Sequence, residues 1–234
     1  MLQINSVNNG NCLDLMNDIN DKSIDMILCD LPYGTTACKW DTVIPFEPLW
    51  AHYKRIIKDN GAIVLTASQP FTSALVMSNI KMFKYCWVWH KRTSSNVGAA
   101  RFQPLKTHED RVVFGGGYKP IMTTGVKRMK GGKANSGEAN GSLPPVYYES
   151  DQYYPKSVLD IKSERGHHPT QKPVALFEYL IKTYTNEGEL VLDNCAGSGT
   201  TAIACLKTNR NYILIEQESK YCEIANRRIA EFMP

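Results

Sequence analysis

Short apolar runs separated by stretches of helical periodicity limit most strongly what this chain can fold into. The runs show no polar alternation and are too short for buried helices, which is typical of strands covered on both faces of a sheet. They occupy residues 24–29, 62–66, 85–89, 111–114, 190–192 and 212–215. Between them, apolar residues recur at helical spacing, most clearly in 173–184 and 221–232. The alternation predicts an α/β fold with a doubly wound, parallel sheet.

The bulk composition narrows the class of protein. A chain of 234 residues can form one α/β domain with a small insert, and a net charge of +4 permits a polyanionic partner without requiring one. No apolar stretch approaches the roughly 20 residues that span a bilayer, so we expect a soluble, cytoplasmic protein with no membrane partner. The seven cysteines form no C-x-x-C pair, and His167 and His168 have no ligand cluster beside them. We therefore expect reduced, buried thiols and no metal site.

A carboxylate, a proline and an aromatic residue directly follow the run 24–29, in the order Asp30-Leu31-Pro32-Tyr33-Gly34. Open α/β sheets bind their ligands at the carboxyl ends of parallel strands, so this position favours a functional site. The same residue types also make good turns, and a plain strand-ending turn is the alternative.

A glycine-rich segment follows the run 190–192 and leads into a helix, in the order Asp193-Asn194-Cys195-Ala196-Gly197-Ser198-Gly199-Thr200-Thr201. The glycines allow a sharp turn and a close approach of a ligand to the backbone, and the helix start presents free N–H groups. The next run ends in Glu216, at a suitable distance to hydrogen-bond a ribose diol. These features predict a nucleoside site, and the alternative is an ordinary turn with a surface glutamate.

Two other segments carry weaker signals. In the stretch 168–173, Thr170 can cap the following helix, and Lys172 can bind a small carboxylate together with the helix N-terminus. Residues 115–166 are rich in Gly, Lys, Ser and Pro and predict an irregular insert, either a solvated loop or a surface that binds a phosphate backbone. Between 115 and 137 it has no acidic residue and five basic ones: Lys119, Lys127, Arg128, Lys130 and Lys133.

The motifs and their order resemble those of the β group of DNA amino-methyltransferases. Residues 30–33 are similar to the D-P-P-Y motif, with Leu31 in place of the first proline. Residues 193–201 are similar to the cofactor loop D-P-F-A-G-S-G-T-T, and 168–173 match the third signature, H-P-T-Q-K-P. The catalytic motif precedes the cofactor loop, and the basic insert lies between them, where this group has its target-recognition region. The resemblance spans about residues 10 to 228.

The resemblance implies a seven-stranded, mostly parallel, Rossmann-like methyltransferase sheet. Its implied parts are a catalytic half (1–114), a target-recognition insert (115–166) and a cofactor-binding half (167–234). The implied cofactor is S-adenosylmethionine and the implied partner is double-stranded DNA. A homodimer and a cognate restriction endonuclease are left open.

The resemblance also assigns roles to single residues. Asp30 and the backbone carbonyls of Leu31 or Pro32 are expected to accept the hydrogens of the target amino group, and Tyr33 to stack on a flipped base. The expected cofactor residues are Asn11, Asp30, Thr170, Lys172, Asp193, Cys195, Ala196, Gly197, Ser198, Gly199, Thr200, Thr201 and Glu216. Asn11 stands where the family has an acidic residue, which leaves its contact with the adenine of the cofactor open. The five basic residues of the insert are expected to bind DNA.

Within this family, an Asp at the first motif position favours N6 of adenine as the target, and N4 of cytosine is the alternative. The sequence contains no Pro-Cys dipeptide, which argues against methylation at carbon 5 of cytosine. An alternative from another class is a catalytically silent module that binds nucleic acid on the same scaffold. Such a module should have lost Asp30 or the glycine-rich loop, and both are intact.

Overall fold

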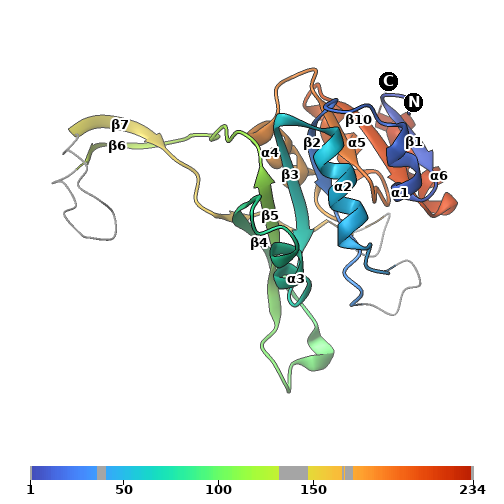
Figure 1. The fold of residues 1–234 in the computed structure, drawn as a ribbon. Coiled ribbons are helices and arrows are strands. Elements are labelled where there is room, and N and C mark those ends of the chain that lie inside the picture. Colours follow the sequence, from blue (N-terminus) through green and yellow to red (C-terminus); the bar gives the residue numbers. More distant parts are fainter. Residues whose placement is uncertain (1, 36–40, 132–146, 165, 167–170, 233–234) are drawn as a thin grey trace. The chain divides into compact units, whose positions relative to one another are not determined.

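The protein is described by a computed structural model that covers residues 2–35, 41–131, 147–164, 166 and 171–232 (Figure 1). The chain divides into two compact units. One consists of Met1–Lys119 with Ser157–Pro234, and the other of Pro120–Lys156. Within the described residues, no helix combines the length and the apolar character needed to cross a lipid bilayer.

An eight-stranded sheet forms the centre of the larger unit. Its spatial order is β1-β10-β9-β2-β3-β5-β4-β8. All neighbours are parallel except β5, which is antiparallel to both β3 and β4. The strands are β1 (Ser6–Asn9), β2 (Ile24–Cys29), β3 (Ile57–Ala67), β4 (Phe83–Ser95), β5 (Lys106–Gly115), β8 (Val158–Asp160), β9 (Leu190–Asp193) and β10 (Asn211–Glu216). The mostly parallel sheet that the sequence predicts is confirmed.

The sheet has eight strands, whereas the resemblance implied seven. The strand β8 was not predicted from the sequence. This strand pairs with β4 from Val88↔Val158 to His90↔Asp160. Its three residues were assigned to the insert, because a strand this short produces no recognisable apolar run.

Two helical layers cover the sheet, because successive residues of a strand point to opposite faces. Met26 and Leu28 of β2 pack with apolar residues of α4 and α5, whereas Ile27 and Cys29 pack with those of α1, α2 and α3. The helices are α1 (Cys12–Leu15) with the 3-10 turn η1 (Met16–Asp18), α2 (Phe46–Ile56), α3 (Phe71–Ser78), α4 (Val174–Tyr184), α5 (Thr200–Lys207) and α6 (Ser219–Phe232). This doubly covered sheet explains why the central strands read as continuous apolar runs.

The chain reverses its direction of winding between the neighbouring strands β9 and β2. From β9 it passes through α5 to β10 on one side, and from β2 it passes through α2 to β3 on the other. The turns that follow β2 and β9 therefore open at the same edge of the sheet, at its topological switch point. Asp30 and Asp193 both stand at that edge. They are 163 positions apart in the chain, and the pairing of β2 with β9 brings them together.

The smaller unit contains a two-stranded antiparallel sheet of β6 (Thr123–Gly131) and β7 (Tyr147–Tyr153). The pairing runs from Thr123↔Tyr153 to Gly131↔Tyr147, with a shift between Thr124 and Arg128. This part of the chain was expected to be irregular. The glycines and lysines of β6 hide the strand signal, because neither residue type favours strands.

A glycine after β9 is required by the packing of the last helix. Gly199 has φ of +77°, and a Cβ there would lie 2.9 Å from the Cβ of Ala225 in α6. Gly188 has almost the same backbone conformation, with φ of +80°, but its added Cβ would meet no atom within 4 Å. A side chain at Gly199 would therefore meet both backbone strain and steric overlap, whereas one at Gly188 would meet backbone strain alone.

We expect Gly199→Ala to lower the free energy of unfolding by roughly 2–4 kcal/mol, because a positive φ and overpacking both oppose the new methyl group. Gly188→Ala, which introduces only the backbone strain, should cost about 1 kcal/mol. Urea titrations of both variants measure the difference. Equal losses would show that α6 shifts away from Gly199 at no cost.

Candidate functional site

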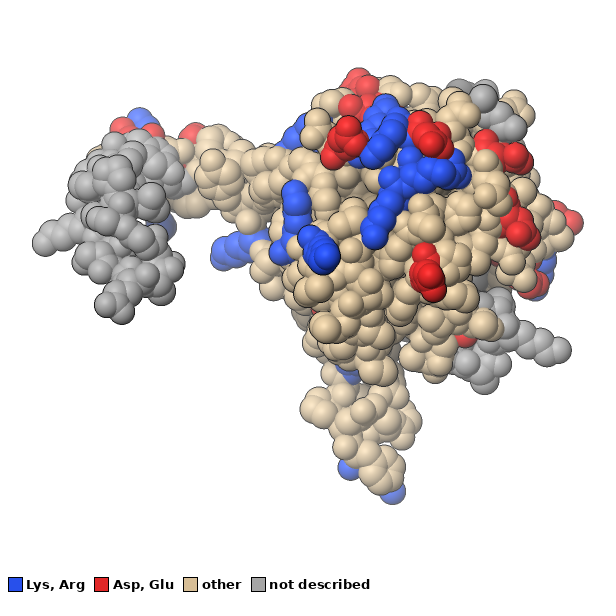
Figure 2. Space-filling model, viewed as in Figure 1, with Lys and Arg blue, Asp and Glu red and all other residues tan. Residues whose placement is uncertain are grey.

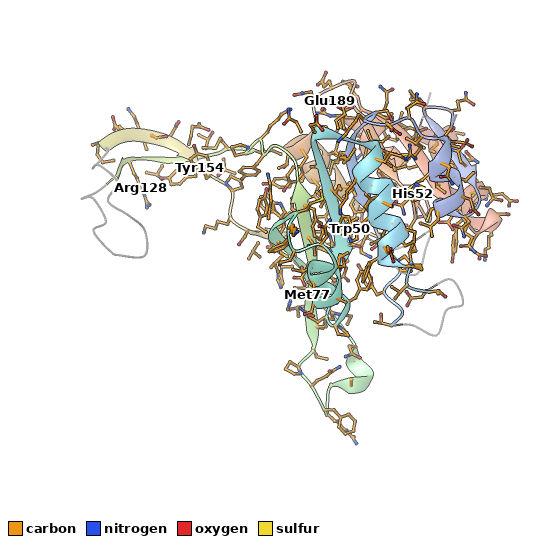
Figure 3. All side chains as sticks on the ribbon, in the orientation of Figure 1. Trp50, His52, Met77, Arg128, Tyr154 and Glu189 are labelled. Atoms are coloured by element: carbon orange, nitrogen blue, oxygen red, sulfur yellow. The ribbon has the colours of Figure 1, made fainter. Side chains whose placement is uncertain are left out.

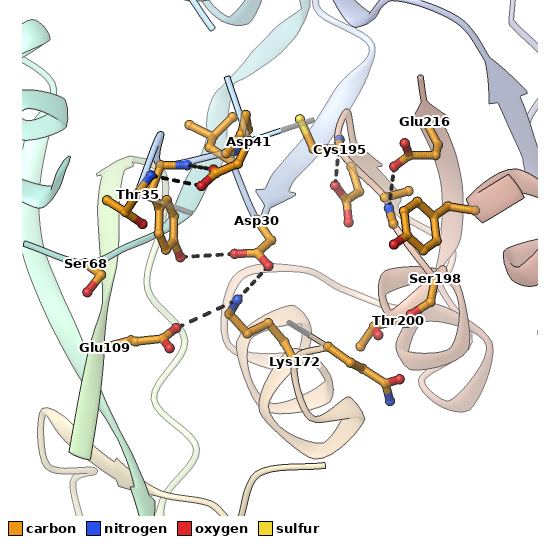
Figure 4. Close-up of a pocket in the computed structure, with 18 of the residues that line it drawn as sticks. Asp30, Thr35, Asp41, Ser68, Glu109, Lys172, Cys195, Ser198, Thr200 and Glu216 are labelled. Carbon is orange, nitrogen blue, oxygen red and sulfur yellow. Dashed lines mark hydrogen bonds and ion pairs between the residues drawn. The ribbon is translucent and has the colours of Figure 1, made fainter. Parts of the chain in front are cut away.

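A cavity of about 1000 Å³ lies at the carboxyl edge of the sheet, where the turns after β2 and β9 meet (Figure 4). Its walls also include the ends of β4, β5 and β10. The predicted site residues that line it are Asn11, Asp30, Leu31, Pro32, Tyr33, Lys172, Asp193, Cys195, Ala196, Gly197, Ser198, Thr200 and Glu216. The D-L-P-Y motif and the glycine-rich loop, which are far apart in the sequence, thus share one cavity, as is usual at the carboxyl edge of an open α/β sheet.

Two of the predicted cofactor residues that the structure describes are not among those that line the cavity. Gly199 packs against α6, as described above. Thr201 is fully buried and its hydroxyl donates a hydrogen bond to the carboxylate of Asp193, so it supports the loop from behind. Thr170 lies outside the described residues.

The Asp30 carboxylate is held from three sides. Its Oδ2 accepts a hydrogen bond of 2.6 Å from Nζ of Lys172, which is only 7% exposed. Its Oδ1 accepts from the hydroxyl of Tyr33 at 3.1 Å and from Thr66 of β3. Burial, reinforced by the Asp30 carboxylate, raises the pKa of Tyr33 well above its usual value, so the hydroxyl remains protonated. These contacts fix the orientation of the carboxylate in the cavity wall.

Tyr33 and Lys172 have contacts that their sequence positions did not indicate. The ring of Tyr33 stacks on Phe71 of α3, with the ring centroids 5.2 Å apart. Lys172 was expected to bind a carboxylate of the cofactor, and in the structure its ammonium group contacts Asp30. Lys172 precedes α4 and lies 142 positions from Asp30, so only the folded chain brings the two together.

A second carboxylate, Asp41, anchors the turn that carries the D-L-P-Y motif. Its Oδ1 accepts from the backbone N–H groups of Tyr33 and Gly34 at 2.7 and 2.9 Å, and its Oδ2 accepts from Thr35 at 2.9 Å. Asp41 is 8% exposed. Sequence reasoning missed this residue, because an Asp after an unpatterned stretch gives no sign of which backbone groups it will meet.

A buried charged cluster surrounds Glu109 of β5, next to the catalytic motif (Figure 4). Its carboxylate lies 3.2 Å from Nζ of Lys91, 3.6 Å from Arg111 and 3.8 Å from Nζ of Lys172. Burial opposes the ionisation of Glu109, but the positive charges of Lys172, Arg111 and Lys91 outweigh it and lower its pKa to about 2. Glu109 therefore stays ionised and shares Lys172 with Asp30.

Sequence reasoning missed the Glu109 cluster. The run 111–114 marked only the apolar half of β5, and the polar half, Lys106 to Asp110, has no buried-strand pattern. An arginine at the edge of that run was a weak signal. Arg111 is fully buried and lies 4.9 Å above the ring of Trp89, which no sequence pattern indicates.

The glycine-rich loop and the end of β10 form the other wall of the cavity. Glu216 is 9% exposed, and its carboxylate accepts from the backbone N–H groups of Gly197 at 2.7 Å and Glu218 at 2.9 Å. Burial raises its pKa, and these hydrogen bonds act in the opposite direction. The parallel pairing of β1 with β10 brings the N-terminal segment to the same wall. There Asn11 caps α1, because its side-chain oxygen accepts from the N–H of Leu13 at 2.9 Å.

Asp193 is nearly inaccessible at the base of the glycine-rich loop. Its carboxylate accepts from the Thr201 hydroxyl and from the N–H of Cys195 at 3.1 Å. Burial raises its pKa to about 7, against the opposing effect of these hydrogen bonds. Asp193 therefore has a structural role, because its hydrogen bonds connect the glycine-rich loop to the start of α5.

The basic residues predicted to bind DNA occupy different places. Lys119 belongs to the larger unit and donates to the side chain of Asn186 at 2.5 Å. Lys127, Arg128 and Lys130 lie on β6, where Lys127 is 3.0 Å from Glu149 of β7. Lys133 lies outside the described residues. The insert is thus less purely basic than the stretch 115–137 indicates, because β7 contributes an acidic partner.

We expect the Glu109 cluster to stabilise the protein in a pH-dependent way. The pKa of Glu109 is about 2 in the folded protein against an ordinary value of 4.5, so its contribution is present above pH 4.5 and is lost as the pH falls towards 2. At pH 7, Glu109→Gln should lower the free energy of unfolding by about 3 kcal/mol. Urea titrations at decreasing pH should show this gap narrowing below pH 4.5. The exposed Glu187→Gln is the control, and a gap that stays constant with pH would contradict the assignment.

Comparisons with known proteins agree with this geometry. Residues 24–227 match the family profile described as DNA methylase, N6_N4_Mtase. Type II methyltransferase M2.MboI of Moraxella bovis is 28% identical over 96% of this chain and 87% of its own length. DNA adenine methyltransferase YhdJ of Escherichia coli (strain K12) is 30% identical over 94% of this chain and 81% of its own length. The fold matches the crystal structure of the M1.HpyAVI–SAM complex with a TM-score of 0.65, at 23% identity over 95% of this chain and 98% of that one. The chain therefore belongs to the DNA methylase family.

Proposed function

We propose that this protein transfers the methyl group of S-adenosylmethionine to N6 of an adenine that is flipped out of duplex DNA. The observation that carries the proposal is the position of Asp30. Its carboxylate is oriented by Lys172, Tyr33 and Thr66 at the point where the wall formed by the glycine-rich loop meets the wall formed by the D-L-P-Y motif. A hydrogen-bond acceptor fixed beside a nucleoside site, in the same cavity, is what transfer to an amino group requires.

The cavity fits a nucleoside that carries a positive charge. Seven acidic residues line it, against three lysines. They are Asp30, Asp41, Glu109, Glu164, Asp193, Glu216 and Glu218, against Lys91, Lys106 and Lys172. Glu216 retains acceptor capacity for a ribose diol beside its two backbone hydrogen bonds, and the backbone of 195–198 lines the same wall. These residues and Asn11 would hold S-adenosylmethionine, which supplies an electrophilic methyl group on a positively charged sulfur when bound.

Asp30 has two tasks in this proposal. The exocyclic nitrogen of adenine is a poor nucleophile, because its lone pair is delocalised into the ring. A carboxylate that accepts one amino hydrogen favours a lone pair localised on nitrogen and offsets the positive charge that develops there. The backbone carbonyl of Leu31 or Pro32, in the same cavity wall, is placed to accept the second hydrogen.

Lys172 orients Asp30, and Glu109 in turn helps to hold Lys172. The ammonium group lies 2.6 Å from Asp30 and 3.8 Å from Glu109, and it is almost completely shielded from water. A buried lysine between two carboxylates cannot leave either one without exposing an unpaired charge. We therefore infer that Lys172 acts through Asp30 and contributes orientation more than cofactor affinity.

Two observations support adenine as the target base. The resemblance described above implies that an Asp at the first motif position, here Asp30, favours adenine. One relative that is 30% identical over 94% of this chain bears the name DNA adenine methyltransferase. N4 of cytosine presents the same amino chemistry and is the competing outcome in the experiment.

Expression in a bacterial host that lacks DNA methylation tests both the reaction and the base. We expect sequencing that detects modified bases to find N6-methyladenine at one defined site. Asp30→Ala should abolish the modification, because the loss of a charge-stabilising acceptor costs several kcal/mol in the transition state. Calorimetry should show binding of S-adenosylmethionine within about tenfold of the wild type.

Asp59→Ala is the matched control, because Asp59 is an exposed carboxylate that pairs with Lys22 outside the cavity. Methylation by Asp30→Ala at the wild-type rate would remove Asp30 from the mechanism. Detection of N4-methylcytosine in place of N6-methyladenine would show that the target base is cytosine. The proposal of methyl transfer to an amino group would remain valid.

We also propose that the segment assigned to the insert contributes to DNA recognition. The support is its basic residues on β6 and its place in the chain between the catalytic motif and the cofactor loop. Lys119 is not included, because it bonds to Asn186 within the larger unit. The ion pair of Lys127 with Glu149 reduces the positive charge that this strand presents.

Neutralising Lys127, Arg128, Lys130 and Lys133 together should weaken DNA binding and flatten its salt dependence. Each phosphate contact contributes about 0.9 to the slope of log affinity against log salt, so the slope should fall by up to about 4. Fluorescence anisotropy over a salt series measures it. The control removes four exposed lysines, Lys22, Lys58, Lys84 and Lys182, which lie near the amino ends of the parallel strands, at the opposite edge from the cavity. An unchanged slope in the first variant would show that these residues make no phosphate contacts.

A further inference from the structure

The hairpin between β4 and β5 extends past the sheet at the edge where the cavity opens (Figure 1). β5 is antiparallel to both β3 and β4, so β4 runs in the same direction as β2 and β3 and ends at their carboxyl edge. The last β3–β5 pair is Ala67↔Asp110, but β4 and β5 stay paired as far as Ser95↔Lys106. We call residues 95–106 the β4–β5 hairpin.

The base of the β4–β5 hairpin forms part of the catalytic cavity. Its residues Ser95, Asn96 and Lys106 line the cavity together with Thr93 and Ser94. A continuous series of polar contacts also joins it to the catalytic carboxylate. Asp30 contacts Lys172, Lys172 contacts Glu109, Glu109 contacts Lys91, and Nζ of Lys91 donates to Oγ of Ser95 at 3.0 Å. The hairpin therefore begins at the rim of the site.

The tip of the hairpin presents an aromatic ring to solvent. Phe102 is 88% exposed, the highest value among the large apolar side chains that the structure describes as exposed. Its backbone forms a hydrogen-bonded turn, in which the N–H groups of Phe102 and Gln103 both donate to the carbonyl of Ala99, at 2.9 and 3.1 Å. Val97 at the same tip is 69% exposed. A partner that covers this ring gains the free energy of burying its apolar surface.

The charge of the hairpin indicates which partner covers it. Residues 95–106 contain two basic residues, Arg101 and Lys106, and no acidic one, and Lys91 and Arg92 precede them on β4. Lys91 and Arg92 pair with Glu109 and Asp160, whereas Arg101 and Lys106 have no ion pair with the described residues. Figure 2 shows blue and no red at the end of this projection on the visible face. A basic tip with an apolar point fits a nucleic acid better than a second copy of itself, which would bring like charges together.

We propose that Phe102 is a wedge that enters the base stack of the duplex beside the flipped adenine. This rests on the proposed transfer to a flipped base. Extruding a base removes its stacking and pairing and leaves a gap in the duplex. An apolar ring that fills the gap keeps the neighbouring bases stacked and buries its own exposed surface, as apolar wedges do when they enter base steps. Arg101 and Lys106 contact the flanking phosphates.

The wedge makes a distinctive prediction, because it acts on the cost of flipping and not on the chemistry. Phe102→Ala should slow single-turnover methylation at least about tenfold on a fully paired duplex that carries the site mapped by sequencing, since unstacking and unpairing cost a few kcal/mol. On the same duplex with an abasic site opposite the target, where no pair has to be broken, the variant should approach the wild-type rate. Phe102→Trp should retain activity on both duplexes.

Met77→Ala is the matched control, because Met77 on α3 is also an apolar side chain that is 70% exposed (Figure 3). Phe102 lies in water, so its substitution leaves the core intact, and calorimetry should show unchanged binding of S-adenosylmethionine. A 2-aminopurine at the target position should report less flipping in Phe102→Ala than in the wild type.

Several results would overturn the wedge. Wild-type rates of Phe102→Ala on the paired duplex would do so, as would an equal loss on the paired and abasic duplexes, which marks a general contact. Sedimentation that shows a wild-type dimer and a Phe102→Ala monomer, with the same ratio of rates on the two duplexes, would assign the tip to self-association. Failure of the proposed function would be seen in the sequencing experiment, as a wild-type protein that modifies no base. That result would overturn the wedge as well.

Discussion

The ion pair of Lys172 with Asp30 is the interaction on which the arrangement of the site depends. It joins the turn after β2 to the segment before α4, across 142 positions of the chain. Its two partners are 7% and 24% exposed, so each would be left with a poorly solvated charge if the other were removed. Buried pairs of this kind add little net stability compared with apolar residues, but breaking them is costly. Their value in an active site is geometric, because they allow one orientation of the carboxylate.

Glu109 extends this pair into a network with three cations. In this network three cations, Lys91, Lys172 and Arg111, lie close to two carboxylates, Asp30 and Glu109. The opposite wall of the cavity has the reverse character, with Glu216 and Glu218 near the glycine-rich loop. A cationic cofactor is therefore favoured beside the acidic wall.

Parallel strands explain why so many functional segments converge on one edge. The carboxyl ends of β2, β4, β9 and β10 all open there, and the reversal between β9 and β2 separates the loops that follow them. The same rule that places the D-L-P-Y motif beside the glycine-rich loop also places the β4–β5 hairpin at the rim. One geometric constraint therefore accounts for the nucleoside site, the catalytic carboxylate and the surface that we assign to the duplex.

The sequence by itself determined the fold class and the location of the two principal motifs. Apolar runs such as 24–29 and 190–192 mark strands buried on both faces, and the residues that follow them must stand at the carboxyl edge. Only the tertiary structure decided which side chains face each other there. Asp41 and Glu109 give no local signal, because their roles depend on N–H groups and cations that arrive from other segments. Lys172 reads as a ligand for the cofactor until the fold places it against Asp30, and β8 is too short to form a pattern. Periodicity records which face of an element is buried, whereas contacts between polar groups distant in the chain are set when the elements pack.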